Sequence, residues 1–96
     1  MRIIVKAYFS LQKATGGKSP IEIENSSATL RELLEDLAKR FGTEFTEAVY
    51  DSGQRVPAAH IMLLVNGRNY LSIPERLETP LKDGDEIALF PPLAGG

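Results

Sequence analysis

The glycine pair Gly95-Gly96 at the end of the sequence is the feature best suited to chemistry. Glycine has no Cβ, so this backbone can enter a channel too narrow for other residues. Pro91 and Pro92 cannot donate hydrogen bonds to a strand, and they favour an extended path. A carboxylate on such a stalk could be activated as an acyl adenylate by another protein's ATP chemistry and then accept sulfur or an amine. From these residues alone, a tail without function or a truncated chain remains equally open.

No other set of residues predicts an active site. The 96 residues include no cysteine and one histidine, His60. This excludes disulfides and thiolate chemistry and gives little support to a histidine-based centre. Asp83 and Asp85 flank a glycine, as in a turn, and Gly16-Gly17 lacks the lysine and following helix of a phosphate loop. We therefore expect no catalytic residues, no metal and no bound cofactor.

Composition and charge indicate one globular domain. Hydrophobic residues make up 43% of the chain and charged residues 25%, which is ordinary globular usage. The net charge of −2 gives no electrostatic footprint for nucleic acid or an anionic membrane. The longest apolar run is far shorter than the ~20 residues of a membrane span, and no signal peptide is evident. We expect a cytoplasmic protein that binds neither nucleic acid nor membrane, with a folded domain over residues 1–91 and a flexible tail over residues 92–96.

Hydrophobic periodicity predicts the elements that position this tail. Thr29 and Glu32 fit a capping box that opens a helix with leucines at helical spacing. Gly16-Gly17 is expected to turn a hairpin between the first two strands, and Asn66-Gly67 to turn a second hairpin. The expected strands are residues 2–9, 21–24, 60–65, 68–71 and 86–90; the expected helices are 29–41 and 44–50; and the expected loops are 51–59 and 72–81.

The order of these elements predicts an α+β domain. The first and last strands cannot be sequential hairpin partners, so both are expected to lie centrally and to pair with each other. One main helix then covers one face of a mixed sheet. This is the ubiquitin-like β-grasp arrangement.

The sheet face opposite the main helix is expected to be unusually apolar. Its predicted members are Ile4, Tyr8, Met62, Leu64, Ala88 and Phe90. A water-facing sheet should carry polar residues at these positions, and a contiguous exposed apolar surface usually marks an interaction site. Residues 50–59 or self-association could cover this face. We favour partner docking, because the face leads through Phe90 into the tail, with Tyr8 and Phe90 as the expected anchors.

Several segments together resemble the MoaD/ThiS family of ubiquitin-like sulfur-carrier proteins, and most closely the small subunit of molybdopterin synthase. They are Gly16-Gly17, the capped helix, Val65-Asn66-Gly67 and residues 81–87 and 90–96. The resemblance implies a carrier without catalysis of its own. An E1-like enzyme would use ATP to adenylate its terminal carboxylate, which becomes a thiocarboxylate. The sulfur would then be donated inside a synthase, such as the molybdopterin synthase large subunit or its tungsten-cofactor counterpart.

The resemblance also assigns roles along the tail. Gly96 carries the acyl group and the sulfur, Gly95 is the spacer that threads, and the docking segment comprises Phe90, Pro91, Pro92 and Leu93. Similar relatives supply sulfur for cysteine or thiamine synthesis, and archaeal relatives with the same ending become attached to lysines. The alternatives are therefore another sulfur pathway, a ubiquitin-like protein modifier conjugated through Gly96, or a β-grasp interaction domain with an inert tail.

Overall fold

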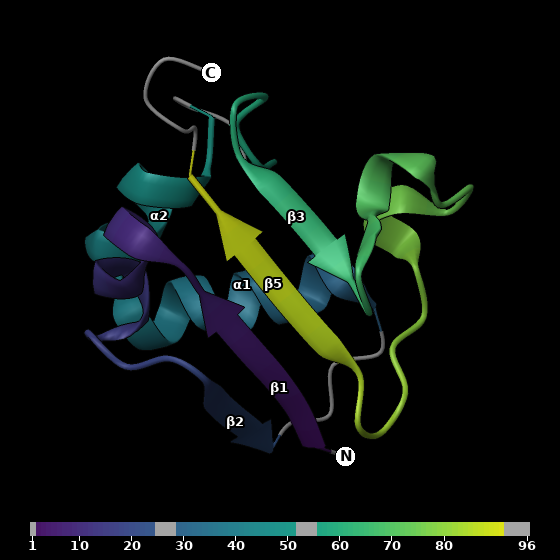
Figure 1. The fold of residues 1–96 in the computed structure, drawn as a ribbon, viewed down its shortest axis with the longest axis horizontal. Coiled ribbons are helices and arrows are strands. Elements are labelled where there is room, and N and C mark those ends of the chain that lie inside the picture. The colour runs from purple at the N-terminus through teal and green to yellow at the C-terminus, as the bar shows by residue number, and fades with distance from the viewer. Residues whose placement is uncertain (1, 25–28, 52–55, 92–96) are drawn as a thin grey trace.

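Over residues 2–24, 29–51 and 56–91, which the computed structural model describes, the chain forms a five-stranded mixed sheet with helices behind it (Figure 1). The strands are β1 (Arg2–Ala7), β2 (Ile21–Glu24), β3 (Met62–Val65), β4 (Arg68–Asn69) and β5 (Glu86–Phe90). Their order is β2-β1-β5-β3-β4, and β1 and β5 run parallel while the other neighbours are antiparallel. The predicted pairing of the first and last strands is confirmed, and the fold is a ubiquitin-like β-grasp.

The main helix α1 (Leu30–Phe41) crosses behind the sheet (Figure 1). Its first turn has the predicted capping box, in which the Thr29 hydroxyl accepts the Glu32 N–H and the Glu32 carboxylate accepts the Thr29 N–H, each at 3.2 Å. These two bonds satisfy backbone donors that the first turn of a helix leaves unpaired. The predicted second helix is α2 (Thr43–Val49).

The hydrophobic core lies between the sheet and α1. Alternate strand residues point inward and are buried, because successive side chains of a strand point to opposite faces. The buried strand residues are Ile3, Val5, Ala7, Ile23, Leu63, Val65, Ile87 and Leu89. From α1 the core receives Leu30, Leu33, Leu34 and Leu37, and from α2 Phe45 and Val49.

The first connection differs from the prediction. Strand β1 ends at Ala7, and Phe9 begins the 3-10 helix η1 (Phe9–Thr15), so the expected strand over residues 2–9 is two residues too long. Leu11 and Ala14 of η1 are buried in the core, whereas Phe9 is exposed. Gly16, at φ 73°, caps η1 and does not form a two-residue hairpin turn. The antiparallel pairing of β1 with β2 is nevertheless confirmed.

Smaller differences concern the second half of the chain. His60 lies outside the third strand and is exposed, because β3 begins at Met62. The predicted hairpin at Asn66-Gly67 is confirmed, but its return strand β4 has only two residues before η2 (Tyr70–Ser72). The Asn69 side chain ends that strand by accepting the Leu71 N–H at 2.9 Å. The region expected to be irregular contains η3 (Arg76–Glu78).

Leu37→Ala is expected to lower the free energy of unfolding by ~2–5 kcal/mol, because truncating a fully buried leucine removes apolar contacts and leaves a cavity. Lys39→Ala is the matched control on the same helix, where the side chain is exposed. It should change the free energy of unfolding by about 0.5 kcal/mol or less. Urea denaturation followed by circular dichroism measures both variants, and equal losses would contradict the orientation of α1.

Candidate functional site

The sheet face turned away from α1 carries a continuous set of side chains from three strands. We call this set the open face: Ile4, Lys6, Tyr8, Met62, Leu64, Glu86, Ala88 and Phe90. The register places Met62 opposite Phe90, and both Leu64 and Lys6 opposite Ala88. Paired residues share a face of a sheet. All six residues predicted for this face from the sequence are therefore brought together on it.

Two aromatic rings stack where β1 and β5 end. The Tyr8 and Phe90 ring centroids are 4.3 Å apart, and the ring planes differ by only 3°. The Tyr8 N–H donates to the Leu89 carbonyl at 3.0 Å, which continues the parallel pairing one residue past β1. Met62, opposite Phe90, is 48% exposed. We call Tyr8, Phe90 and Met62 the aromatic end of the open face.

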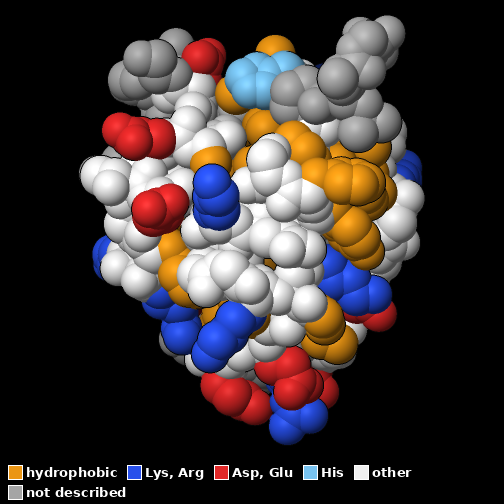
Figure 2. All heavy atoms as spheres, turned by 60° about the vertical axis from the view of Figure 1, so that its left-hand side comes forward, with side chains coloured by type: hydrophobic (Ala, Val, Ile, Leu, Met, Phe, Trp, Pro, Cys, Tyr) orange, Lys and Arg blue, Asp and Glu red, His pale blue; other side chains and the backbone are white. Residues whose placement is uncertain are grey.

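The middle of the open face holds an ion pair. The Lys6 Nζ lies 2.8 Å from Glu86 Oε1. The hydrogen bond that the Lys6 ammonium donates to the Glu86 carboxylate, together with the negative charge of that carboxylate, raises the pKa of Lys6 above the ordinary lysine value. This ion pair lies between the aromatic end and the charged residues at the start of β1 and β5. Figure 2 shows hydrophobic side chains at the upper right and acidic and basic side chains that meet at the bottom.

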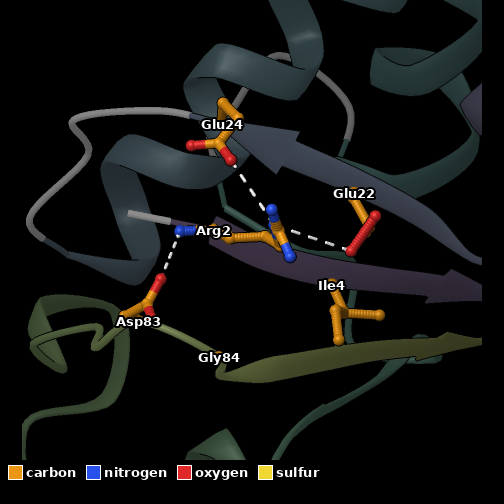
Figure 3. A pocket seen from close by; sticks show the side chains of 6 residues that line it. All are labelled: Arg2, Ile4, Glu22, Glu24, Asp83 and Gly84. Atoms are coloured by element: carbon orange, nitrogen blue, oxygen red, sulfur yellow. Dashed lines mark hydrogen bonds and ion pairs between the residues drawn. The ribbon is translucent and has the colours of Figure 1, made fainter.

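The charged end surrounds Arg2. The side-chain Nε of Arg2 lies 3.4 Å from Glu24 Oε1 and 3.7 Å from Glu22 Oε1. The backbone N–H of Arg2 donates a hydrogen bond to Asp83 Oδ1 at 2.7 Å (Figure 3). A hollow of about 370 Å³ lies among these residues and is also lined by Ile4 and Gly84. The hollow lies at the start of β1 and β5, whereas Phe90 lies at the other end of these strands. The hydrogen bond from Arg2 to Asp83 attaches the turn before β5 to the start of β1.

The residues of the described ranges offer no second chemical site. Within them, no group of three or more histidine, cysteine or acidic side chains is placed to hold a metal ion. No helix among them combines the length and apolar character that crossing a membrane requires. The candidate site is therefore the open face together with the segment that follows it.

The predicted site residues divide into two groups. Tyr8, Met62, Leu64 and Phe90 lie on the open face, and Pro91 follows β5 directly and is half-buried. Pro92, Leu93, Gly95 and Gly96 lie outside the described residues.

The segment proposed as a cover for the open face is bound elsewhere, as far as the structure describes it. The Asp51 N–H donates to the Val56 carbonyl, and the Ala58 N–H donates to the Val49 carbonyl at the end of α2, both at 2.8 Å. Ala58 belongs to the core cluster, and Val56 packs against it. The described part of residues 50–59 is therefore attached to α2 and the core.

Two features of this region could not be predicted from the sequence. The first is the Lys6–Glu86 ion pair, which depends on the parallel register of β1 and β5. The sequence alone does not define this register. The exposure of Phe9 follows from a change of backbone direction after Tyr8 that strand alternation does not signal.

A family model matches almost the whole chain. The model is described as the ThiS family, and it covers residues 7–96. It therefore includes the last residue of β1, the whole of β5 and the segment through the glycine pair.

Two curated relatives match most or all of the chain. A "Putative sulfur carrier protein" of Archaeoglobus fulgidus is 31% identical over 83 residues, which cover 86% of this chain and 91% of the relative. "Small archaeal modifier protein 3" of Haloferax volcanii is 28% identical over 96 residues, which cover all of both chains.

Solved structures match along the whole fold. The "Putative molybdopterin converting factor, subunit 1" of Pyrococcus furiosus is 31% identical with a TM-score of 0.71, covering 97% of this chain and 99% of its own. A chain of the BexX/CysO complex of Amycolatopsis orientalis is 26% identical with a TM-score of 0.77, covering 98% and 99%.

The pKa of Lys6 is expected to exceed its ordinary value of 10.5, and Glu86→Gln should lower it. Folding raises the pKa of Lys6, so the Lys6–Glu86 pair stabilises the folded chain fully at pH values below the pKa of Lys6 in the unfolded chain. This stabilisation is lost as the pH rises through the pKa of Lys6 in the folded chain. NMR titration of the Lys6 side chain in the alkaline range measures both proteins. An identical pKa in the two would remove Glu86 as the cause.

Proposed function

The chain belongs to the ThiS family, and from this premise we propose that it is a sulfur carrier whose Gly96 carboxylate holds the transferred sulfur. The observation that carries the proposal is the family match, which extends through Gly96. The relative of A. fulgidus that is named a sulfur carrier supports it. The protein itself then needs no catalytic residues, because its partners supply the chemistry.

The proposed loading reaction has two steps. The Gly96 carboxylate attacks the α-phosphorus of ATP in an E1-like adenylating enzyme, and an acyl adenylate forms as pyrophosphate leaves. Hydrosulfide then attacks the carbonyl carbon and displaces AMP, which leaves a thiocarboxylate. The thiocarboxylate sulfur displaces a leaving group from the acceptor and forms a thioester. Water then hydrolyses the thioester, which restores the Gly96 carboxylate and leaves the sulfur on the acceptor as a thiol. Gly95 lets the segment enter a narrow active site, because it adds no side chain.

The open face is the proposed docking surface for these partners. It is apolar at the aromatic end, and Phe90 is both a member of that end and the last residue of β5. The five steps from the Cα atom of Pro91 to that of Gly96 span at most about 18 Å, at the maximum extension of ~3.3–3.6 Å per residue. A partner that takes Gly96 into its active site must therefore approach the end of the sheet where Tyr8 and Phe90 stack.

We propose molybdopterin synthesis, or the related tungsten cofactor, as the destination of the sulfur. The acceptor would then be a synthase such as the molybdopterin synthase large subunit. Support comes from the P. furiosus structure, which is named a molybdopterin converting factor subunit and is 31% identical to this chain.

The second candidate is a protein modifier, in which a lysine amine displaces AMP from the same acyl adenylate and forms an isopeptide bond. Its support is the H. volcanii modifier, which matches over the full length of both chains. Mass spectrometry of protein isolated from the source cells separates the two functions. A thiocarboxylate adds the mass difference between sulfur and oxygen at Gly96, whereas conjugation yields larger species joined through Gly96.

Deleting Gly96 should leave the thermal midpoint unchanged and abolish adenylation. The reason is that the buried core ends with Leu89, one residue before the end of β5, whereas the reacting carboxylate would be moved by one residue. Differential scanning calorimetry and ATP–pyrophosphate exchange with the adenylating enzyme measure the two properties. Exchange that survives the deletion would refute the carrier function, and a lowered midpoint would mean that the last residue contributes to the fold.

Tyr8→Ala and Phe90→Ala should each weaken binding to the adenylating enzyme by ~1 kcal/mol or more, as truncated aromatic anchors do at protein interfaces. Leu71→Ala is the control, because Leu71 is 53% exposed but follows β4 at the far edge of the sheet. Isothermal titration calorimetry is performed on variants whose circular dichroism matches the wild type. Losses smaller than this in both aromatic variants would place the docking surface elsewhere.

A further inference from the structure

Phe9 has an unusual backbone conformation. Its φ is +56°, in the left-handed region that bulky side chains rarely adopt. Hydrogen bonds hold the chain on both sides of it. The Tyr8 N–H donates to the Leu89 carbonyl at 3.0 Å, and the Leu11 N–H donates to the Tyr8 carbonyl at 3.1 Å. The conformation is therefore set by the junction between β1 and η1, whatever side chain stands at position 9.

The fold makes little use of the Phe9 ring. The side chain is 66% exposed and is not part of the core cluster, which η1 enters through Leu11 and Ala14. A glycine at this position would adopt the same φ without steric cost. The phenyl ring thus adds an exposed apolar surface at a position where the backbone favours a residue without a side chain. Strained residues of this kind concentrate at functional sites.

The position of Phe9 relates it to the aromatic end. Its ring centroid lies 6.5 Å from that of Tyr8, which stacks on Phe90. Phe9 therefore extends the apolar surface from the open face around the end of β1 toward η1. Since β1 and β5 are parallel neighbours, this extension borders the end of β5 from which the chain continues to Gly96.

We propose that Phe9 is a binding anchor for the E1-like adenylating enzyme, inserted into an apolar pocket on that enzyme beside its site for the glycine pair. The inference rests on the proposed carrier function. The maximum reach of about 18 Å from Pro91 to Gly96 selects this occupant, because the enzyme that adenylates Gly96 must come close to the end of β5. An exposed, pre-positioned aromatic side chain is the type of residue that dominates interface binding energy.

The test compares Phe9→Gly, Phe9→Ala and the Leu71→Ala control. The probe is the purified E1-like enzyme of the source organism, and the readout is ATP–pyrophosphate exchange as a function of carrier concentration. Both Phe9 variants should raise KM for the carrier by about tenfold or more with kcat unchanged, as loss of an aromatic anchor predicts. Leu71→Ala should leave KM unchanged. The thermal midpoint of Phe9→Gly should be no lower than that of wild type, because glycine relieves the left-handed conformation.

The remaining outcomes overturn the inference in distinguishable ways. If wild type supports exchange and both Phe9 variants stay within about twofold of its KM, far below the effect of losing an anchor, Phe9 is no anchor. A KM raised only by Phe9→Gly would assign the effect to backbone freedom and not to the ring. A self-association constant weakened in Phe9→Gly, with KM unchanged, would assign the ring to contact with a second copy. If wild type itself supports no exchange, the proposed carrier function fails, and the inference fails with it.

Discussion

The parallel pairing of β1 with β5 is the interaction on which the rest of the structure depends. It joins the first strand of the described chain to the last, and hydrogen bonds extend it at both ends, from the Ile4 N–H to the Asp85 carbonyl and from the Tyr8 N–H to the Leu89 carbonyl. Without it, the sheet would divide into a two-stranded unit of β2 and β1 and a three-stranded unit of β5, β3 and β4, and an isolated two-stranded unit is marginal in water. The same pairing brings Tyr8 against Phe90, so the scaffold and the candidate docking surface have one origin.

Polar contacts at the other end of this pair fix its register. The Arg2 N–H donates to Asp83, and the Gly84 N–H donates to the Arg2 carbonyl, both at 2.7 Å. Gly84, at φ 87°, permits the tight turn that these contacts require. A shift of one residue would turn the core side chains of β5 to the opposite face, which makes a well-defined register essential here. The charged end therefore supports the site from a distance.

Much of this arrangement could be predicted from the sequence, because local rules decided it. Alternation located the buried faces of β1, β3 and β5, and the capping box marked the start of α1. The glycine pair and the prolines predicted where the proposed chemistry lies, and the chain's resemblance to a family suggested the reaction. The turn after Tyr8 could not be predicted, since alternation continues through Phe9 in the sequence and only tertiary hydrogen bonds set its positive φ. The Lys6–Glu86 pair was missed for a similar reason, because it joins positions 80 residues apart.

The central position of β5 has a consequence for synthesis of the chain. Ribosomes release residues from the N-terminus onward, so β1 is made long before its parallel neighbour exists. Contacts between distant segments also form slowly, because a large loop must close before they contribute. Until β5 emerges, the inward residues Ile3 and Val5 lack the strand beside them, and Tyr8 has no ring to stack on. The proposed docking surface is thus completed only with β5, so a partner that recognised it would distinguish the folded chain from a nascent one.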